Sequence, residues 1–286
     1  MNKLFLVNSQ WQGGGAISAM YGINEIENLY LKGESSILPE GFPYETVSVN
    51  DSEESLAMKN NILGYDAIKK QTLEAASLIS KHDPDKIFTI GGSCEADISS
   101  ILHLNEKYNR DLLVIWIDAH GDINAPHESY SHLFYGMPIR ALLGECGDIL
   151  SDVLKENMKP DQFMNLCGRS IDPPEKEYYQ KHSIPMIEVD EIVQSYATDF
   201  TPVKKAMLRS GKKYVHIHLD FDSLDPAEFP NTPLPETSGL PVKYLLPLID
   251  AIKETLIPVG FSFYEYTPID KKHPLVEKLL DFGFEF

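Results

Sequence analysis

The sequence predicts an α/β protein built on a mostly parallel, doubly wound sheet. Short apolar runs alternate with longer stretches of helical pattern, and this rhythm is typical of that class. The clearest run is Leu112–Ile117, six consecutive apolar residues rich in branched and aromatic side chains, which suits a strand buried on both faces. The sequence contains no repeat, low-complexity tract or obvious linker, so we expect residues 1–286 to form one domain.

Strands and helices are expected in alternation from the first residues onward. Strands, each a short and mainly apolar run, are expected at residues 4–8, 45–49, 86–90, 112–117, 162–167, 214–219 and 257–263. Helices are expected at residues 17–31, 56–81, 95–109 and 137–143, and another begins at Pro173 or Pro174 because a first turn tolerates proline. The glycine-rich stretch 12–15 lacks the spacing of a dinucleotide fingerprint, so we interpret it as a flexible loop.

Composition narrows the classes of function. The formal net charge of -18 argues against nucleic acid and anionic membrane surfaces and favours cationic substrates or divalent metals. No apolar run approaches the roughly 18 residues that span a bilayer, and the first ten residues do not resemble a signal peptide. The three cysteines, Cys94, Cys146 and Cys167, are odd in number and widely spaced, which predicts a reducing cytoplasm rather than a disulfide framework.

The apolar run 112–117 ends in three potential metal ligands. Asp118, His120 and Asp122 stand at alternate positions, and on an extended backbone this spacing would send them to one side. Open α/β sheets hold their sites at the carboxyl ends of strands. Two carboxylates and one imidazole suit Mn2+ or Mg2+ better than a structural zinc. The alternative is a helix-capping aspartate within a polar loop.

A second motif repeats this arrangement. The run 214–219 is apolar except for two histidines and leads into Asp220 and Asp222. Several carboxylates close together repel one another unless cations neutralise them. Two such strand ends therefore predict a shared metal site of about five ligands, with room for a two-metal cluster.

Here the motifs carry a family resemblance. DAHGDIN at residues 118–124, followed by HLDFDSLDP at residues 218–226, resembles the arginase/agmatinase (ureohydrolase) family, which hydrolyses guanidino groups with a dinuclear manganese cluster. The resemblance implies a three-layer α/β/α sandwich with a central, mostly parallel eight-stranded sheet. It places one Mn2+ on Asp118, Asp122 and Asp220 and the other on His120, Asp118, Asp220 and Asp222. A metal-bound hydroxide would then attack the guanidinium carbon.

The same resemblance suggests how a substrate is held. Glu265 matches the carboxylate that binds the guanidinium through charge-assisted hydrogen bonds. Asn124 and Ser131 match positions that bind the α-carboxylate of the substrate, and Asp172 and Glu175 match positions that recognise its α-amino group. These matches favour an amino-acid substrate over agmatine. For each residue the alternative is a solvated polar side chain in a loop.

Cys94 departs from the family pattern. It stands in Gly91-Gly92-Ser93-Cys94, where the family's GGDHS turn carries a histidine ligand of the first metal. A thiolate ligand would shift preference from Mn2+ towards Zn2+ or Fe2+, whereas a neutral thiol would remove a ligand and weaken that metal, which leaves open one ion instead of the family's two. A branch of the family carries this cysteine, and members resembling it act on Nω-hydroxy-L-arginine. The alternative is an inert, buried thiol.

Tyr135 is the second departure. It precedes Gly-Met-Pro where arginases have a proton-shuttling histidine, and a phenol with a pKa of about 10 shuttles protons poorly at neutral pH. His127 and His132 lie in the same loop as candidate substitutes or as surface residues. His218 either supports a metal ligand or is a buried strand residue. We therefore expect a catalytic set of Asp122, Glu265 and Tyr135 with altered activity.

The predicted function is metal-dependent hydrolysis of a C–N bond in a linear guanidino amino acid, of the arginine or Nω-hydroxyarginine type. The expected partner is that small molecule, with no nucleic acid and no membrane, and a homo-oligomer is left open. One alternative is a degenerate, non-catalytic relative with a partial metal site. Another is a changed substrate: agmatine, guanidinobutyrate or formiminoglutamate.

Overall fold

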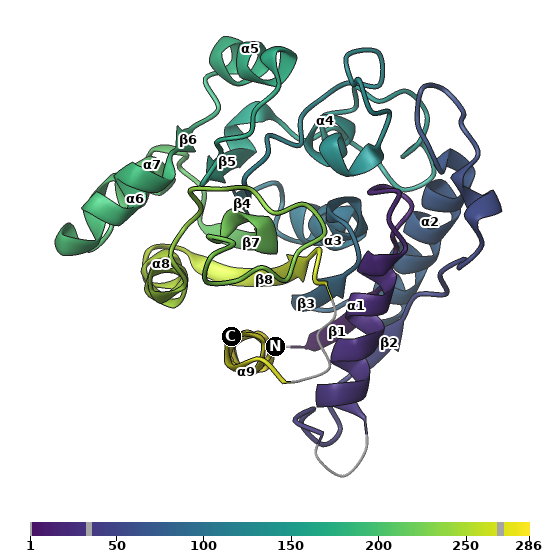
Figure 1. Ribbon diagram of the computed structural model, residues 1–286, viewed down its shortest axis with the longest axis horizontal. Helices are drawn as coiled ribbons and strands as arrows, with labels where there is room; N and C mark the ends of the chain where they lie inside the picture. The colour runs from purple at the N-terminus through teal and green to yellow at the C-terminus, as the bar shows by residue number, and fades with distance from the viewer. Residues whose placement is uncertain (1, 33–35, 268–271) are drawn as a thin grey trace.

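The computed structural model describes residues 2–32, 36–267 and 272–286, and its eight strands form one parallel sheet (Figure 1). The strand order is β2-β1-β3-β8-β7-β4-β5-β6, and every neighbouring pair runs parallel. The strands are β1 (Lys3–Asn8), β2 (Tyr44–Thr46), β3 (Lys86–Gly91), β4 (Leu112–Ile117), β5 (Phe163–Leu166), β6 (Met186–Ile187), β7 (Tyr214–Asp220) and β8 (Ile257–Tyr264). The predicted α/β class with an eight-stranded parallel sheet is confirmed.

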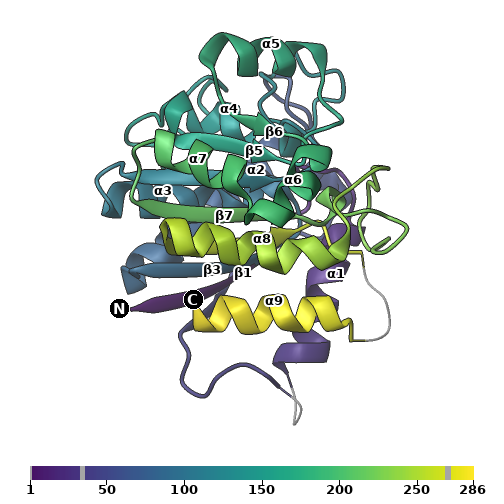
Figure 2. The same ribbon diagram turned by 90° about the vertical axis from the view of Figure 1, so that its left-hand side faces the viewer.

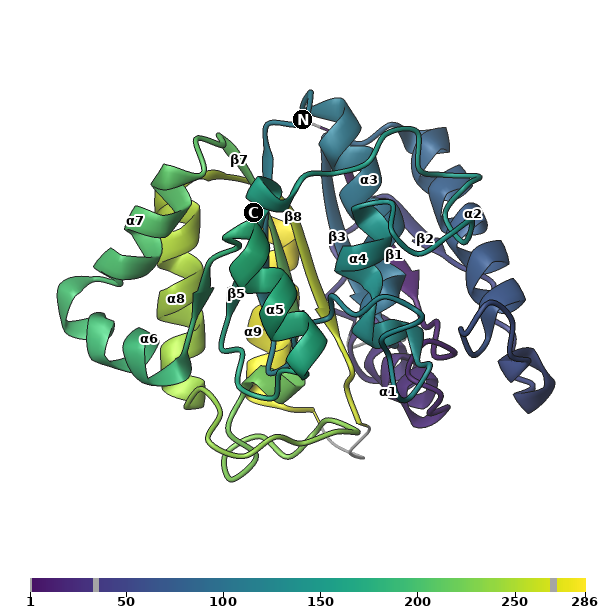
Figure 3. The same ribbon diagram turned by 90° about the horizontal axis from the view of Figure 1, so that it is seen from above.

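Helices cover both faces of the sheet, which gives the three layers seen in Figures 2 and 3. One face packs against α1 (Ser18–Ile26), α6 (Val189–Ser195), α7 (Thr201–Arg209), α8 (Val242–Thr255) and α9 (Pro274–Glu285). The other face packs against α2 (Tyr65–His82), α3 (Ile98–Lys107), α4 (Pro138–Leu142) and α5 (Pro173–His182). Side chains alternate along a strand, so the two apolar faces of each central strand supply both buried layers. None of the helices in the described ranges is long and apolar enough to cross a membrane.

Several predicted element boundaries are wrong for local reasons. The expected helix at residues 56–81 begins only at Tyr65, because Asn60, Asn61 and Gly64 adopt positive φ angles that interrupt helical backbone. The expected helix at residues 17–31 ends in a π-helical turn, Glu27–Leu31. The expected strand at residues 45–49 is the short edge strand β2, and β6 and α6 to α9 were not predicted.

The strand order brings four distant segments to one edge. From β3 the chain crosses to β4 and leaves a gap that β7 and β8 later fill, so β3, β8, β7 and β4 are adjacent in the sheet centre. Parallel strands end at the same edge, and this edge receives Cys94, Asp118, Asp220 and Glu265. Backbone hydrogen bonds extend the pairing past the strand ends: Glu265 N–H donates to the Gly92 carbonyl at 3.0 Å.

Candidate metal centre

The loop after β4 carries three of the predicted donors. β4 ends at Ile117, and the backbone then turns: Asp122 has a φ of 51°. The backbone through Asp118, His120 and Asp122 is therefore not extended, contrary to the prediction, although Asp118 still shares a donor group with His120. One contact within the loop and one to β5 hold it in place: His120 N–H donates to Asp118 Oδ1 at 2.7 Å, and the His120 carbonyl accepts from Asn165 Nδ2 at 2.8 Å.

The end of β7 lies beside this loop. Asp220 closes β7, and its Oδ1 accepts the N–H of Asp222 at 2.8 Å, which fixes a short 3-10 turn. Asp222 Oδ1 in turn accepts the N–H of Ala119 at 3.1 Å. Because β4 and β7 are neighbouring parallel strands, these bonds join the two aspartate motifs into one site.

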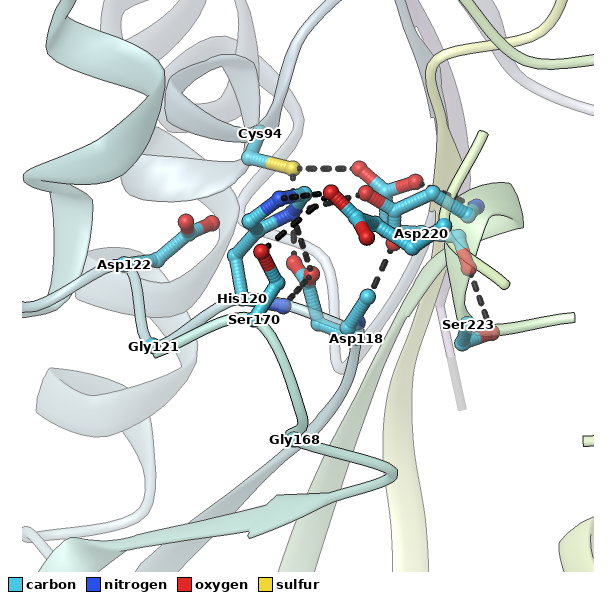
Figure 4. A network of polar contacts seen from close by, with 12 residues as sticks. Cys94, Asp118, His120, Gly121, Asp122, Gly168, Ser170, Asp220 and Ser223 are labelled. Atoms are coloured by element: carbon cyan, nitrogen blue, oxygen red, sulfur yellow. Dashed lines mark hydrogen bonds and ion pairs between the residues drawn. The ribbon is translucent and has the colours of Figure 1, made fainter. Parts of the chain in front are cut away.

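Cys94 faces both motifs from the turn after β3. Its Sγ lies 3.0 Å from Asp220 Oδ2 and 3.9 Å from Asp118 Oδ2, as the dashed lines in Figure 4 indicate. Burial, followed by the charge of Asp220 and other carboxylates, raises the pKa of the Cys94 thiol well above its ordinary value. The thiol therefore stays protonated and donates a hydrogen bond to Asp220 Oδ2.

Three overlapping groups of donors lie in the described part of the chain, each with its ligand atoms within 4.8 Å of one another. They are Cys94, Asp118 and His218; Cys94, Asp220 and Glu265; and Asp118, His120 and Asp222. Cys94 and Asp118 each belong to two groups, so the three form one continuous cluster. Asp122 stands to one side of the Cys94–Asp220 pair in Figure 4, and its Oδ2 accepts the Trp116 indole N–H at 3.1 Å. The same N–H lies 3.0 Å from Asp118 Oδ2.

The carboxylates of this cluster repel one another as anions. All are buried, and burial together with neighbouring carboxylates raises the pKa of Asp222 to about 6. The same causes raise the pKa values of Asp122, Asp220 and Glu265 well above their ordinary range. Such shifts show that the site favours added positive charge.

His120 partly supplies that charge. Its Nδ1 lies 2.8 Å from Asp222 Oδ2 and 3.5 Å from Asp118 Oδ1. Burial lowers the pKa of His120, but the two carboxylates outweigh burial and raise it far above its ordinary value. Burial likewise raises the pKa of Asp118, yet contact with His120 brings it below its usual range. One protonated imidazole does not balance the charges of the two carboxylates that it contacts.

Glu265 completes the cluster from the end of β8. It has a φ of 61°, and its side chain is buried. No hydrogen-bond donor among the described residues reaches its Oε1. A buried carboxylate with a free oxygen is costly, and it is suited to a cationic group that arrives with a ligand.

Comparison with known proteins gives the family. Residues 19–275 match the family described as "Arginase family". The chain belongs to the arginase family. It is 28% identical over 226 residues to an arginase of Staphylococcus aureus (strain MRSA252), covering 78% of this chain and 74% of the relative. To the Bacillus caldovelox arginase it is 30% identical over 182 residues, 63% of this chain and 60% of the relative. The structure of Entamoeba histolytica arginase in complex with L-ornithine has a TM-score of 0.85 at 19% identity, covering 100% of this chain and 99% of that chain, a likeness of fold.

The donors of this arginase-family protein fit divalent metals. The group of Asp118, His120 and Asp222 offers oxygen and nitrogen, the donors that suit Mn2+, whereas Cys94 adds sulfur to the other two groups. Glu265 Oε1 is buried and accepts no hydrogen bond within the described ranges, whereas Asp222 Oδ2 is paired only with His120 Nδ1, at 2.8 Å. The Glu265 oxygen is therefore available to a cation, and Asp222 and His120 form an ion pair that a metal ion would replace.

The predicted substrate residues of this arginase-family protein belong to none of the three donor groups in the described ranges, and we call them the rim: Asn124, Ser131, Asp172 and Glu175. Asn124 Nδ2 donates to Asp172 Oδ2 at 3.0 Å, and Asn124 Oδ1 is buried with no partner in the part of the chain described. Both Glu175 oxygens accept backbone N–H groups, from Ile123 and Asp172, each at 3.0 Å. Glu175 therefore joins the loop at Ile123 to the start of α5 at Asp172. Ser131 is exposed and lies further along the segment after β4 that also carries Asn124.

Tyr135 lies in the short 3-10 turn Phe134–Gly136, which follows the loop that carries Ser131. It is half-buried, and burial followed by the charge of Glu265 raises its pKa above the ordinary phenol value. Its N–H donates to the Gly13 carbonyl at 3.2 Å. His127 has a side chain that is 73% exposed, and His132 Nδ1 contacts the Asn61 carbonyl at 3.2 Å. The two histidines are thus turned to solvent or to another loop.

Sequence reasoning missed a buried network beneath the donors. Asp97 Oδ2 contacts His216 Nε2 at 2.7 Å and His218 Nδ1 at 2.8 Å, and accepts from Ser262 Oγ at 2.7 Å. Burial raises the pKa of Asp97, but the two histidines outweigh it and hold that pKa below its usual range. The pattern His-Ile-His before Asp220 was the available signal, because alternate strand positions share a face.

Two further carboxylates near the site were also missed. Glu95 is buried, and its Oε1 accepts from Gln10, Ser93 and the N–H of Gly13 at 2.8 to 3.0 Å. The glycine-rich stretch 12–15 is therefore anchored beside the site. Glu236, from the loop after β7, places Oε1 3.6 Å from His120 Nε2.

Proposed function

We propose that this arginase-family protein is a metal-dependent hydrolase that cleaves a C–N bond of a linear guanidino amino acid. The observation that carries the proposal is Glu265: a buried carboxylate with a free oxygen shares a donor group with Cys94 and Asp220. A guanidinium offers the positive charge and the planar set of N–H donors that such a carboxylate can bind.

Metal ions would be held by the six predicted ligands, Cys94, Asp118, His120, Asp122, Asp220 and Asp222. We propose two ions, with Mn2+ at the oxygen-rich group of Asp118, His120 and Asp222. When bound, they supply a water that is activated as a nucleophile near neutral pH. Asp118 belongs to two donor groups and is the residue best placed to join the two metal positions.

The rest of the chemistry falls to side chains that bind and orient the substrate. Glu265 would hold the guanidinium beside the donor cluster, at a position fixed by its backbone bond to Gly92. At the rim, Asn124, Ser131 and Asp172 would contact the α-carboxylate and α-amino groups. Glu175 supports that contact by tying Ile123 to Asp172.

Nω-hydroxy-L-arginine is the substrate that we favour, in line with the branch that carries a cysteine at this position. Tyr135 retains its proton at neutral pH, so it is a poor proton carrier for an arginine leaving group. The hydroxyl of an N-hydroxyguanidine is more acidic and can relay a proton itself. Hydrolysis of the C–N bond by water would give L-ornithine and hydroxyurea. The three buried free thiols suit the reducing cytoplasm.

A second candidate is a non-catalytic relative that binds a ligand. The contact from the Cys94 thiol to Asp220 favours it, because that bond occupies a carboxylate oxygen otherwise available to metal.

A panel of substrates distinguishes the hydrolase from the non-catalytic binding protein. Purified protein loaded with Mn2+, Zn2+ or Fe2+ would be assayed on Nω-hydroxy-L-arginine, arginine, agmatine, guanidinobutyrate and formiminoglutamate. We expect the highest kcat/KM on Nω-hydroxy-L-arginine, and a loss of about 100-fold or more in Glu265→Gln with unchanged metal content. No turnover of any compound by metal-loaded protein would support the binding protein, and a preference for agmatine would remove the amino-acid assignment.

A further inference from the structure

His218 is held rigidly beneath the donor cluster. Its side chain is fully buried, and its Nδ1 lies 2.8 Å from Asp97 Oδ2. The imidazole ring is stacked between Trp116, with centroids 3.4 Å apart and planes at 6°, and Tyr264, with centroids 4.6 Å apart and planes at 15°. The carboxylate fixes which nitrogen carries the proton, and the two aromatic rings fix the plane in which the other nitrogen points.

The other nitrogen, Nε2, has no hydrogen-bond partner among the residues that the structure describes. An unpaired polar atom in the interior is costly and calls for an explanation. A ring nitrogen of His218, Cys94 Sγ and a carboxylate oxygen of Asp118 lie within 4.8 Å of one another. Nδ1 is engaged by Asp97, so Nε2 is the nitrogen available as a third donor.

We propose that His218 is a metal ligand and forms, with Cys94 and Asp118, one metal position of mixed sulfur, nitrogen and oxygen donors. Asp220, whose Oδ2 lies 3.0 Å from Cys94 Sγ, is the natural fourth ligand. The inference deepens the proposed function and rests on it for the use of the metal. His218, on β7, would then replace the imidazole that is absent at position 94, in the turn after β3.

The donor set and its surroundings favour Zn2+ at this position. Zinc is bound by cysteine, histidine and aspartate in four-coordinate sites, and a coordinating thiol loses its proton to the metal's charge. Histidines that bind metals typically donate their other ring N–H to a carboxylate, the relation that Asp97 has with His218. The group of Asp118, His120 and Asp222, without sulfur, would keep its preference for Mn2+.

His216 offers a matched control. It lies two residues before His218 on the same strand, is equally buried, and contacts the same oxygen of Asp97 through Nε2 at 2.7 Å. Its Nδ1 points instead towards the backbone of Gly260. A Cβ added at Gly260 would lie only 1.9 Å from this nitrogen. His216 therefore shares the environment of His218 but belongs to none of the three donor groups in the described ranges.

The test uses metal spectroscopy on the full chain. Co2+ would be added to metal-stripped protein as a probe for zinc sites, and thiolate-to-cobalt charge transfer would be followed in the near ultraviolet. We expect this band in the wild type and in His216→Gln, and its loss in Cys94→Ser. In His218→Gln we expect the affinity of this site to fall by more than about 100-fold, beyond the roughly 10- to 100-fold typical of groups that only orient a ligand.

A second measurement, on wild-type protein with one equivalent of Zn2+, does not depend on whether the variants fold. X-ray absorption at the zinc edge should show one sulfur at about 2.3 Å together with imidazole scattering. Zinc bound by oxygen and nitrogen alone, or unchanged cobalt binding in folded His218→Gln, would overturn the assignment. Zinc held by sulfur in a protein without hydrolytic activity would instead contradict the proposed function and leave the metal position standing.

Discussion

The inner half of the site and its rim are built in different ways. Asp118, Asp220 and Glu265 lie at the ends of three neighbouring central strands and are at most 3% exposed. The rim residues Ser131 and Asp172 are exposed and lie in loops. Pairing and burial determine positions in the inner half, whereas positions at the rim depend on a few hydrogen bonds between loops. We therefore expect the inner half to control metal binding and chemistry, and the rim to adjust substrate preference.

Asp118→Asn should have the largest effect. The substitution keeps the shape of the side chain but removes the charge shared by two donor groups. We expect loss of both metals and a fall in kcat/KM of more than about 1,000-fold, since activation of water depends on the metals. Elemental analysis and steady-state kinetics would check this. Asp225→Asn, in the loop just after β7, is the control and should retain metal; equal effects in both variants would contradict the comparison.

Metal removal should make stability depend on pH. The pKa of Asp222 is raised to about 6 in the folded chain, and those of Asp220 and Glu265 are raised further. Groups with raised folded pKa values favour the folded state below their unfolded values, near pH 4, and this stability is lost as pH rises through the folded values. Metal-free protein should therefore melt at least about 5 °C lower at pH 8 than at pH 5. Calorimetry with and without Mn2+ tests this, and a metal-free Tm that rises with pH would refute it.

Tyr135→His should produce a smaller, positive effect on arginine. An imidazole near its reference pKa exchanges protons at neutral pH, as the phenol does not. We expect kcat for arginine to rise about tenfold, with little change for Nω-hydroxy-L-arginine. Tyr130→His, on an 80% exposed residue of the same loop, should change neither rate. A matching rise in both variants would remove Tyr135 from the proton-transfer step.

Ser131→Ala should have the smallest effect. The lost hydrogen bond at an exposed position is worth about 1 kcal/mol, so we expect KM for an amino-acid substrate to rise by about two- to fivefold. Agmatine lacks the α-carboxylate and should show no change. An equal rise for both substrates would indicate a change in the loop rather than a lost contact.

Features of the site that depend on local sequence could be predicted, whereas features that depend on how distant segments meet could not. The run 112–117 and the motifs after it marked β4, β7 and the donors, because buried strands and strand-end carboxylates leave local patterns. The number of strands in the sheet came from the family resemblance, not from periodicity. In the buried network, the pair His216 and His218 was visible as alternate residues of one strand, but Asp97 and Ser262 could not be assigned to it because they come from two other segments. The positive φ of Asp122 likewise depends on how the loop closes after β4.

Hydrolysis as a function of bound metal shows directly whether this protein is a metal-dependent hydrolase. Metal-stripped protein would be titrated with Mn2+, desalted, analysed for metal content, and assayed for L-ornithine released from Nω-hydroxy-L-arginine. We predict that hydrolysis appears only with bound metal and reaches its maximum at two ions per chain. Two tightly bound ions with no hydrolysis of any guanidino compound, or hydrolysis without metal, would contradict the account.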